Sequence, residues 1–403
     1  MTTDSPRDAT PRPAVRVAMV TGAYFPELSG GGLQARNLVK ALANDARFTV
    51  ITTSIKPSLP ATASEDGVPI HRVHVDPSSA ASKIGAALRL AKVFVSTRRS
   101  FDIVNLHGFS QKAILLRMLS AIFGKRFVLT LQTGVHDEPE TARRMGRLAS
   151  WAYRGADLYL SVSPGLSRAL LASGIESTRL RQVCNAVDVV RFHPASTEDR
   201  AALRTALGLP ADRKVVLFVG YFSRDKRPDV LFDAWSALPA TLVETSTIVF
   251  VGATLSDYAE VDGELADRIR AAARDRRLDD RVHYVESTLE IERYYRAADV
   301  YVLPSIREGL PIALLEAMAC GLPCIASALP GSTDVLIQSG ENGLLVPPDD
   351  RARLTSVLDS VLSSPTLAAR LGAGARGTIE SRYAIDRTAV DWLDAYRSLA
   401  PAR

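Results

Sequence analysis

Long hydrophobic runs are missing from this sequence. The longest apolar stretch, AILLRMLSAIF at 113–123, is interrupted by Arg117, whereas a membrane-spanning helix needs about 18–20 mostly apolar residues. Residues 1–14 are polar, contain three prolines and lack the apolar core of a secretion signal, so we expect them to form a disordered tail. These absences predict a cytoplasmic protein.

Cysteine is also scarce, with only Cys184, Cys320 and Cys324. An odd number of cysteines in apolar surroundings is typical of buried thiols in a reducing compartment and not of a disulfide framework. Cys320 and Cys324 are four residues apart, but no histidine lies near them in the sequence. We therefore predict no zinc site here.

The length and the apolar pattern predict two domains. A chain of 403 residues is too long for one compact core. Short apolar runs alternate with helical patterns over residues 15–192 and again over 214–375, and the polar stretch 193–213 links the two regions. This alternation predicts an α/β fold with doubly wound parallel sheets, in which ligands bind at the carboxyl ends of the strands. Residues 376–403 read as a C-terminal helix.

Positive charge is concentrated in the first half of the chain. Residues 81–126 contain nine basic residues and one acidic residue, Asp102. Such an excess suggests an anionic ligand or peripheral contact with a membrane surface, and the amphipathic segment 82–99 fits a membrane interface. The alternative is a set of solvated helix faces that do no more than cover the core. No nucleic-acid partner is expected.

The stretch 305–316, SIREGLPIALLE, is the most informative part of the chain. An apolar strand pattern precedes it, Gly309 lies in a loop, and Pro311 is expected at the first position of a helix. A helix N-terminus offers free N–H groups and partial positive charge to a phosphate. Glu308 and Glu316 flank this terminus, and carboxylates accept hydrogen bonds from hydroxyls. The stretch predicts a ligand with both phosphate and sugar hydroxyls; the alternative is an ordinary helix cap with surface glutamates.

Two further turns follow strand patterns. The segment TGAYFPELSGGG places Gly31 and Gly32 before a helix expected from Leu33, either as a turn that approaches a phosphate or as a plain flexible turn. The segment VGYFSRDKRPD carries Arg224 and Lys226. These two cations either neutralise a diphosphate or belong to an ordinary surface loop.

Polar residues at strand ends of the first region are candidates for substrate contact. His107 ends one predicted strand, while Gln132 and His136 follow the next strand, RFVLTLQ. The carboxyl ends of parallel strands lie at one edge of a sheet, where ligands bind.

The run EGLPIALLEAMACGLPCIAS resembles the glutamate–seven–glutamate signature of the retaining GT-B glycosyltransferases of family 4, the group 1 glycosyltransferases. The resemblance implies two Rossmann-like domains facing each other across a cleft. It also implies that Glu316 holds the ribose of a nucleoside diphosphate sugar, that Glu308 holds hydroxyls of the transferred sugar, and that the N–H groups of Gly309 and Leu310 face the diphosphate.

The other motifs match the family with two departures. Gly31 and Gly32 resemble the family's loop over the donor phosphates, and Lys226 matches the family lysine. Tyr221 stands where the family has arginine, so that Arg224 is a candidate replacement. Gln132 stands where the family has histidine.

The expected catalytic group is therefore drawn from four residues: Glu308, His136, Gln132 and His107. Either Gln132 or His136 would take the place of the family histidine. In GT-B proteins the last helix crosses back onto the first domain, and Trp392 suits that packing.

The implied activity is hexosyl transfer from a UDP-, GDP- or related sugar to an acceptor hydroxyl, with retention of configuration. The acceptor would be anionic or lipid-linked, and the chain would work in glycolipid, polysaccharide or glycosylated-metabolite biosynthesis, with peripheral contact at the inner face of the cell membrane as an option. Asp-x-Asp is absent, so no metal or other cofactor is expected. The alternatives are a glycoside phosphorylase, a nucleotide-sugar epimerase or a non-catalytic sugar-nucleotide-binding partner.

Overall fold

The computed structural model describes residues 14–27, 29–134, 136–252 and 261–399. The predicted tail falls almost entirely outside these residues. Within them, no helix combines the length and the apolar character that crossing a bilayer requires.

The first sheet has eight strands in the order β3-β4-β2-β1-β5-β6-β7-β8. All of the printed pairings are parallel except that of β3 with β4. The strands are β1 (Val15–Thr21), β2 (Ala46–Ser54), β3 (Thr62–Glu65), β4 (Val68–His74), β5 (Ile103–His107), β6 (Arg126–Leu131), β7 (Leu158–Ser161) and β8 (Leu180–Gln182). The antiparallel edge strand β3 was not anticipated, because its sequence TASE has no apolar pattern.

The second sheet has six parallel strands in the order β11-β10-β9-β12-β13-β14. The strands are β9 (Lys214–Val219), β10 (Ser246–Val251), β11 (Val282–Val285), β12 (Val300–Leu303), β13 (Cys324–Ser327) and β14 (Leu344–Val346). Every residue of β10, β12 and β13 is buried, as expected for strands covered on both faces. The predicted α/β class with two parallel sheets is confirmed.

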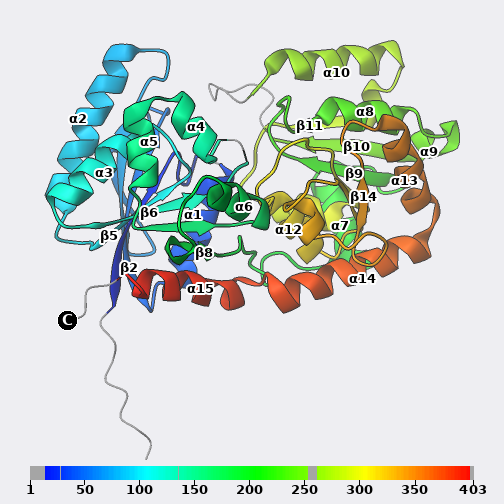
Figure 1. Cartoon of the computed structure of the whole chain (residues 1–403). Helices are drawn as coiled ribbons and strands as arrows, with labels where there is room; N and C mark the ends of the chain where they lie inside the picture. Colours follow the sequence, from blue (N-terminus) through cyan, green and yellow to red (C-terminus); the bar gives the residue numbers. More distant parts are fainter. Residues whose placement is uncertain (1–13, 28, 135, 253–260, 400–403) are drawn as a thin grey trace, which may run out of the picture. The chain divides into compact units, whose positions relative to one another are not determined.

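Helices connect the strands and cover the sheets (Figure 1). In the first part of the chain they are α1 (Gly30–Ala41), α2 (Ala80–Thr97), α3 (Lys112–Ile122), α4 (Pro139–Arg144), α5 (Arg147–Arg154) and α6 (Pro164–Ala172). Further along are α7 (Thr197–Ala206), α8 (Pro228–Ser236), α9 (Ala240–Glu244), α10 (Gly263–Asp275), α11 (Ile291–Ala297), α12 (Ile312–Ala319), α13 (Arg351–Ser363), α14 (Pro365–Arg382) and α15 (Ile385–Arg397). Short 3-10 turns occur at Ser177–Arg179, Asp279–Arg281 and Thr333–Val335.

The sequence pattern around residues 140–153 predicted a single helix, and the structure has two. Gly146, with a φ of +106°, separates α4 from α5. An L-residue rarely adopts this φ, so a glycine at this position ends the first helix.

The chain divides into two compact units. Unit 1 takes the described residues of Met1–Thr130, Arg147–Tyr159 and Val390–Arg403, and unit 2 takes those of Leu131–Gly146 and Leu160–Ala389. The division runs through β6 and β7, so these units differ from the domain limits expected from the sequence, which stay predictions. Val390–Arg403, which contains Trp392, groups with the first 130 residues.

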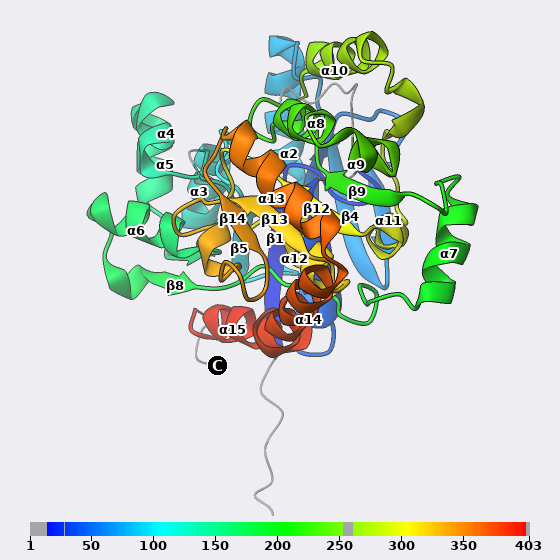
Figure 2. The same cartoon turned by 90° about the vertical axis from the view of Figure 1, so that its right-hand side faces the viewer.

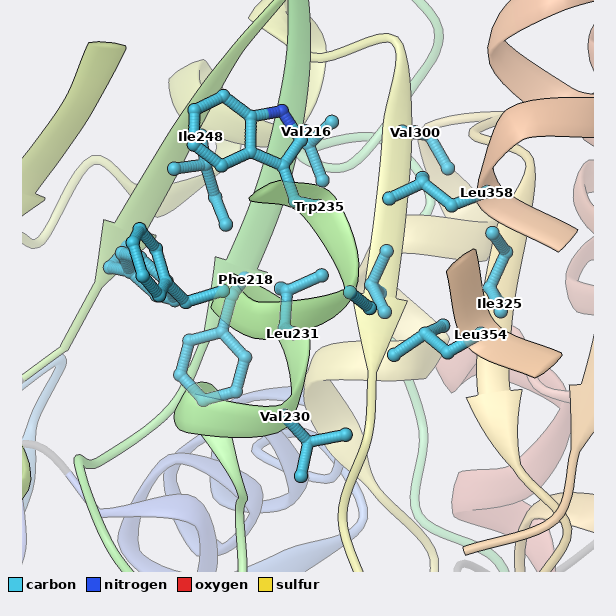
Figure 3. Packing of buried hydrophobic residues seen from close by; sticks show 14 of the residues in the cluster. Val216, Phe218, Val230, Leu231, Trp235, Ile248, Val300, Ile325, Leu354 and Leu358 are labelled. Atoms are coloured by element: carbon cyan, nitrogen blue, oxygen red, sulfur yellow. The ribbon is translucent and has the colours of Figure 1, made fainter. Parts of the chain in front are cut away.

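Unit 2 has a large apolar core. Helices α8 and α10 lie on one side of its sheet, and α12 and α14 lie on the other (Figures 1 and 2). Figure 3 shows Trp235 of α8 and Leu358 of α13 directed toward side chains of the strands, among them Val216 and Val300. The indole N–H of Trp235 donates to Ser246 Oγ over 2.9 Å, so burial leaves no indole donor unpaired. This core fixes the strand ends from which the candidate site extends.

Candidate active site

The loop after β12 carries the central motif into α12. Pro311 has an extended conformation (φ −69°, ψ 115°) and is the N-cap, so α12 begins at Ile312 and not at Pro311 as predicted. No side chain caps this terminus, although the first N–H groups of a helix have no partner within the helix. The N–H of Ile306 donates to Asp225 O over 2.8 Å, which ties the loop to the turn after β9.

Glu308 and Lys226 form an ion pair. Lys226 Nζ donates to Glu308 Oε1 over 2.6 Å, and the Glu308 side chain is only 7% exposed. Lys226 lies in the turn between β9 and α8 and Glu308 in the loop between β12 and α12, so adjacent strands bring the two groups together. A cation and a carboxylate thus meet beside the free N-terminus of α12, an arrangement suited to an anion with hydroxyl groups.

Glu316 is buried within α12. Its Oε2 accepts a hydrogen bond of 3.0 Å from the hydroxyl of Tyr295, which belongs to α11. Burial raises the pKa of Glu316 to about 7, while the Tyr295 hydrogen bond and the charge of Arg191 act in the opposite direction. Arg191 is itself paired with Glu292 over 2.7 Å. Glu316 therefore exchanges its proton near neutral pH.

The loop that follows β6 approaches the Gly309 loop within unit 2. A Cβ atom at position 309 would lie 1.8 Å from the carbonyl oxygen of Gln132, so only glycine fits there. Asp137, which is almost fully buried, accepts hydrogen bonds from the N–H groups of Gln132 (2.6 Å) and Thr133 (2.8 Å). The side chain of His136 is exposed. Of the two candidates for the missing family histidine, Gln132 is the one whose main chain meets Gly309.

Asn185 supports the central loop from a distant part of the sequence. Its side-chain Nδ2 donates to Leu310 O over 2.7 Å, and the residue is almost fully buried. Asn185 and Asp137 were not among the residues predicted for the site. Both are polar residues after a strand, which was the only available signal.

His107 lies inside unit 1. Its ring stacks on that of Trp392, with centroids 5.6 Å apart and an interplanar angle of 13°. Its Nε2 lies 3.3 Å from Asn105 Nδ2, and Asn105 also bonds to Tyr396 Oη over 2.6 Å. Burial lowers the pKa of His107 to about 3, so the ring is neutral. These contacts tie β5 to α15, and the catalytic role suggested for His107 gains no support from them.

Arg224 pairs with a different carboxylate from the one that Lys226 contacts. Its side chain is 86% exposed, and its Nε contacts Asp262 Oδ2 at 3.3 Å. A position in an exposed turn leaves a long side chain free to point into solvent, which the sequence could not exclude. The role of Arg224 as a second cation at the diphosphate therefore stays a prediction, and its contact with Asp262 gives that role no support.

Gly31 and Gly32 lie within α1 and not in a loop before it. The helix starts at Gly30, three residues earlier than predicted, because Ser29 Oγ accepts a hydrogen bond from the N–H of Gly32 over 3.1 Å and caps the terminus. A Cβ atom at position 32 would lie 2.4 Å from Ala23 O, whereas position 31 faces open space. Gly32 is thus needed for close packing, and Gly31 leaves the helix end accessible.

Known proteins match both parts of the chain. The family described as "Glycosyl transferases group 1" matches residues 199–378, and "Glycosyl transferase 4-like domain" matches residues 29–186. The D-inositol 3-phosphate glycosyltransferase of Xylanimonas cellulosilytica is 35% identical over 233 residues, which are 57% of this chain and 54% of that protein. The alignment thus spans about half the length of that relative.

A second relative aligns along nearly the whole chain. The alpha-maltose-1-phosphate synthase of Mycolicibacterium smegmatis is 26% identical over 403 residues, which cover 96% of this chain and 100% of that protein.

Solved structures share the fold. Sucrose-phosphate synthase from Thermosynechococcus elongatus superposes with a TM-score of 0.79 at 23% identity, over 96% of this chain and 99% of that one. HepE from Anabaena, solved with UDP and glucose, gives a TM-score of 0.77 at 19% identity, over 95% of this chain and 100% of that one. These neighbours have the GT-B fold. The sheets, the glutamate motif and both family matches agree, and the chain belongs to the group 1 glycosyltransferases of the GT-B class.

Proposed function

We propose that this protein transfers a hexosyl group from a nucleoside diphosphate sugar to an acceptor hydroxyl, with retention of configuration and without a metal ion. The observation that carries the proposal is the Lys226–Glu308 ion pair beside the uncapped N-terminus of α12. Positive charge from the ammonium group and the helix terminus would stabilise the departing diphosphate. Glu308 would accept hydrogen bonds from the transferred sugar and hold it in place.

In this reaction the bond between the sugar C1 and the diphosphate oxygen breaks, and its electron pair leaves with the nucleoside diphosphate. A bond forms between C1 and the acceptor oxygen, whose proton passes to the departing diphosphate. Glu316, when ionised, would accept hydrogen bonds from the ribose hydroxyls. Asn185 and Gly309 would keep the loop main chain in position, since Asn185 holds Leu310 O and Gly309 allows the close approach of Gln132.

The names of similar proteins suggest which substrates to test first. HepE was solved with UDP and glucose, so UDP-hexoses come first among donors. One relative is named for D-inositol 3-phosphate and another for maltose 1-phosphate, so we propose a phosphorylated sugar or polyol as the acceptor class. The basic residues of unit 1 would favour such an anionic acceptor.

The first experiment is calorimetric titration with UDP, GDP, ADP and dTDP in the presence of EDTA. We expect one nucleotide to bind, and Glu316→Gln to weaken it about tenfold to a hundredfold through loss of a charge-assisted hydrogen bond. Glu264→Gln is the matched control, because that side chain is 88% exposed on α10. No binding of any nucleotide by the folded protein would refute the proposal.

Turnover separates transfer from the other activities open to this fold. With the matching nucleotide sugar, we expect release of the nucleoside diphosphate that depends on an added acceptor and persists in EDTA. NMR of the product should show the anomeric configuration of the donor. Dependence on inorganic phosphate would indicate a phosphorylase instead, and nucleotide binding with no turnover on any acceptor would indicate a binding partner.

A further inference from the structure

Three helices of unit 1 present large apolar side chains to solvent. Helices α2, α3 and α5 lie side by side, with α3 packed against both neighbours (Figure 1). Six large apolar side chains on them are 45–69% exposed: Ile84, Leu88, Met118, Ile122, Leu148 and Trp151. We call these six residues the α2–α3–α5 face.

The six residues are arranged as three short rows. Ile84 and Leu88 are one helical turn apart on α2, as are Met118 and Ile122 on α3, and the same holds for the pair on α5. Single exposed apolar residues are normal on a protein surface, but a group spread over adjacent helices marks an interaction site. The α2–α3–α5 face is therefore a candidate contact surface.

The charged residues of the three helices are all basic. None of the three helices contains an aspartate or glutamate. Lys83, Arg89 and Lys92 lie on α2, and Arg98 and Arg99 follow it directly. No carboxylate of the described residues pairs with any of these five cations within 4.0 Å. Arg89 donates to His74 O and Arg98 to Val95 O, but a carbonyl oxygen does not neutralise a guanidinium charge. The positive charge of all five is therefore available to an external anion.

The nearest acidic residue in the sequence does not offset this charge. Asp102 lies just beyond the cations, but it is bound by Arg16 Nη2 over 2.7 Å and lies 3.9 Å from Lys125 Nζ. Its carboxylate is thus already compensated by two other cations, and the positive charge of α2 remains.

We propose that the α2–α3–α5 face binds the surface of an anionic lipid bilayer. Aliphatic side chains from three helices would enter the boundary between headgroups and acyl chains, and Trp151 would lie at the headgroup level that tryptophan prefers. The cations of α2 would contact lipid phosphates. A nucleic acid would contact the cations and stack its bases on aromatic rings, but rows of exposed aliphatic residues do not contribute to such binding. The combination of both kinds of side chain favours the bilayer.

The test is sedimentation of the full chain with vesicles. One set is phosphatidylcholine alone, and the other contains about one-third phosphatidylglycerol. We expect binding to the anionic vesicles only, weakening as NaCl rises from about 0.05 to 0.5 M, since salt screens the attraction. The assay contains no nucleotide and no sugar, and we expect the protein to bind the vesicles without them. Failure to bind vesicles is therefore distinguishable from failure of the proposed transferase reaction.

Two variants separate the apolar and the electrostatic contributions. Lys92→Gln with Arg99→Gln should weaken binding about 30-fold, at about fivefold for each cation near the surface. Leu88→Ser with Ile122→Ser should weaken it at least about tenfold through loss of buried apolar area. These two apolar side chains are 69% and 65% exposed, so their replacement should leave the fold intact, as circular dichroism would show.

Control variants carry the same changes elsewhere. Val190→Ser with Leu289→Ser removes two exposed apolar residues of unit 2, and Arg268→Gln with Arg353→Gln removes two exposed cations there. Neither should change vesicle binding. No binding to anionic vesicles, or equal loss in the control variants, would overturn the proposal. A third result would also overturn it: vesicle binding that depends on the cations but not on Leu88 and Ile122, together with equal binding of single-stranded DNA. The face would then be a site for polyanions and not for a bilayer.

Discussion

Replacing Glu316 with glutamine should remove a pH dependence from the stability of this protein. Glu316 is buried in α12, where burial raises its pKa from the ordinary value of 4.5 to about 7. The folded protein therefore keeps this proton until about pH 7, whereas the unfolded chain releases it near 4.5. Between these values the folded state binds one more proton, so the free energy of unfolding falls as the pH rises.

The size of the effect follows from the two pKa values. The difference between 4.5 and about 7 corresponds to about 3 kcal/mol. The stabilisation is fully present below about pH 4.5 and is lost as the pH rises through about 7. A glutamine at 316 has no proton to lose. The difference in unfolding free energy, variant minus wild type, should thus rise by about 3 kcal/mol from pH 4.5 to pH 8.

Urea unfolding at a series of pH values measures this difference, because all other titrating groups are common to both proteins and cancel. Tyr295→Phe provides a second arm. The Tyr295 hydroxyl donates to Glu316 Oε2 and lowers the pKa of Glu316. Removal of this hydroxyl should therefore raise that pKa and move the loss of stability to higher pH. A difference curve that is flat between pH 4.5 and 8 would refute the assignment of a raised pKa to Glu316.

Three further changes test the arrangement. Lys226→Met leaves Glu308 buried without its cation and should lower the free energy of unfolding by about 2 kcal/mol. Adding Glu308→Gln to this variant should restore more than half of the lost unfolding free energy. If the effects of the two substitutions on the unfolding free energy were strictly additive in the double-mutant cycle, this would count against the ion pair. Gly309→Ala places a Cβ atom 1.8 Å from Gln132 O, so the loop must shift. We expect kcat/KM to fall about a hundredfold. An unchanged kcat/KM would contradict the close approach of Gly309 and Gln132. Trp392→Ala removes a fully buried ring and should cost about 3–5 kcal/mol in thermal or urea unfolding, and a loss below about 1 kcal/mol would show that this ring is not packed as described.

Local patterns were sufficient to predict most of the elements. Apolar runs predicted most strands of both sheets, since parallel strands are buried on both faces. The short strands β8, β13 and β14 were not predicted. The errors occurred where the local pattern was weak. The edge strand β3 has the polar sequence TASE, and the break between α4 and α5 depends on the φ of Gly146. The start of α1 was misplaced because Ser29 caps a helix that opens with three glycines.

The sequence by itself determined the fold class, the family and the spacing of Glu308 and Glu316. All three depend on residues close together in the chain, where strand and helix periodicity act. Only the tertiary structure decided which groups from distant parts of the chain meet. It paired Glu308 with Lys226, buried Glu316 under Tyr295, and brought Gln132 to Gly309. The physical reason is that contacts between distant segments depend on how strands order in a sheet and how helices pack on it, which no short stretch of sequence encodes.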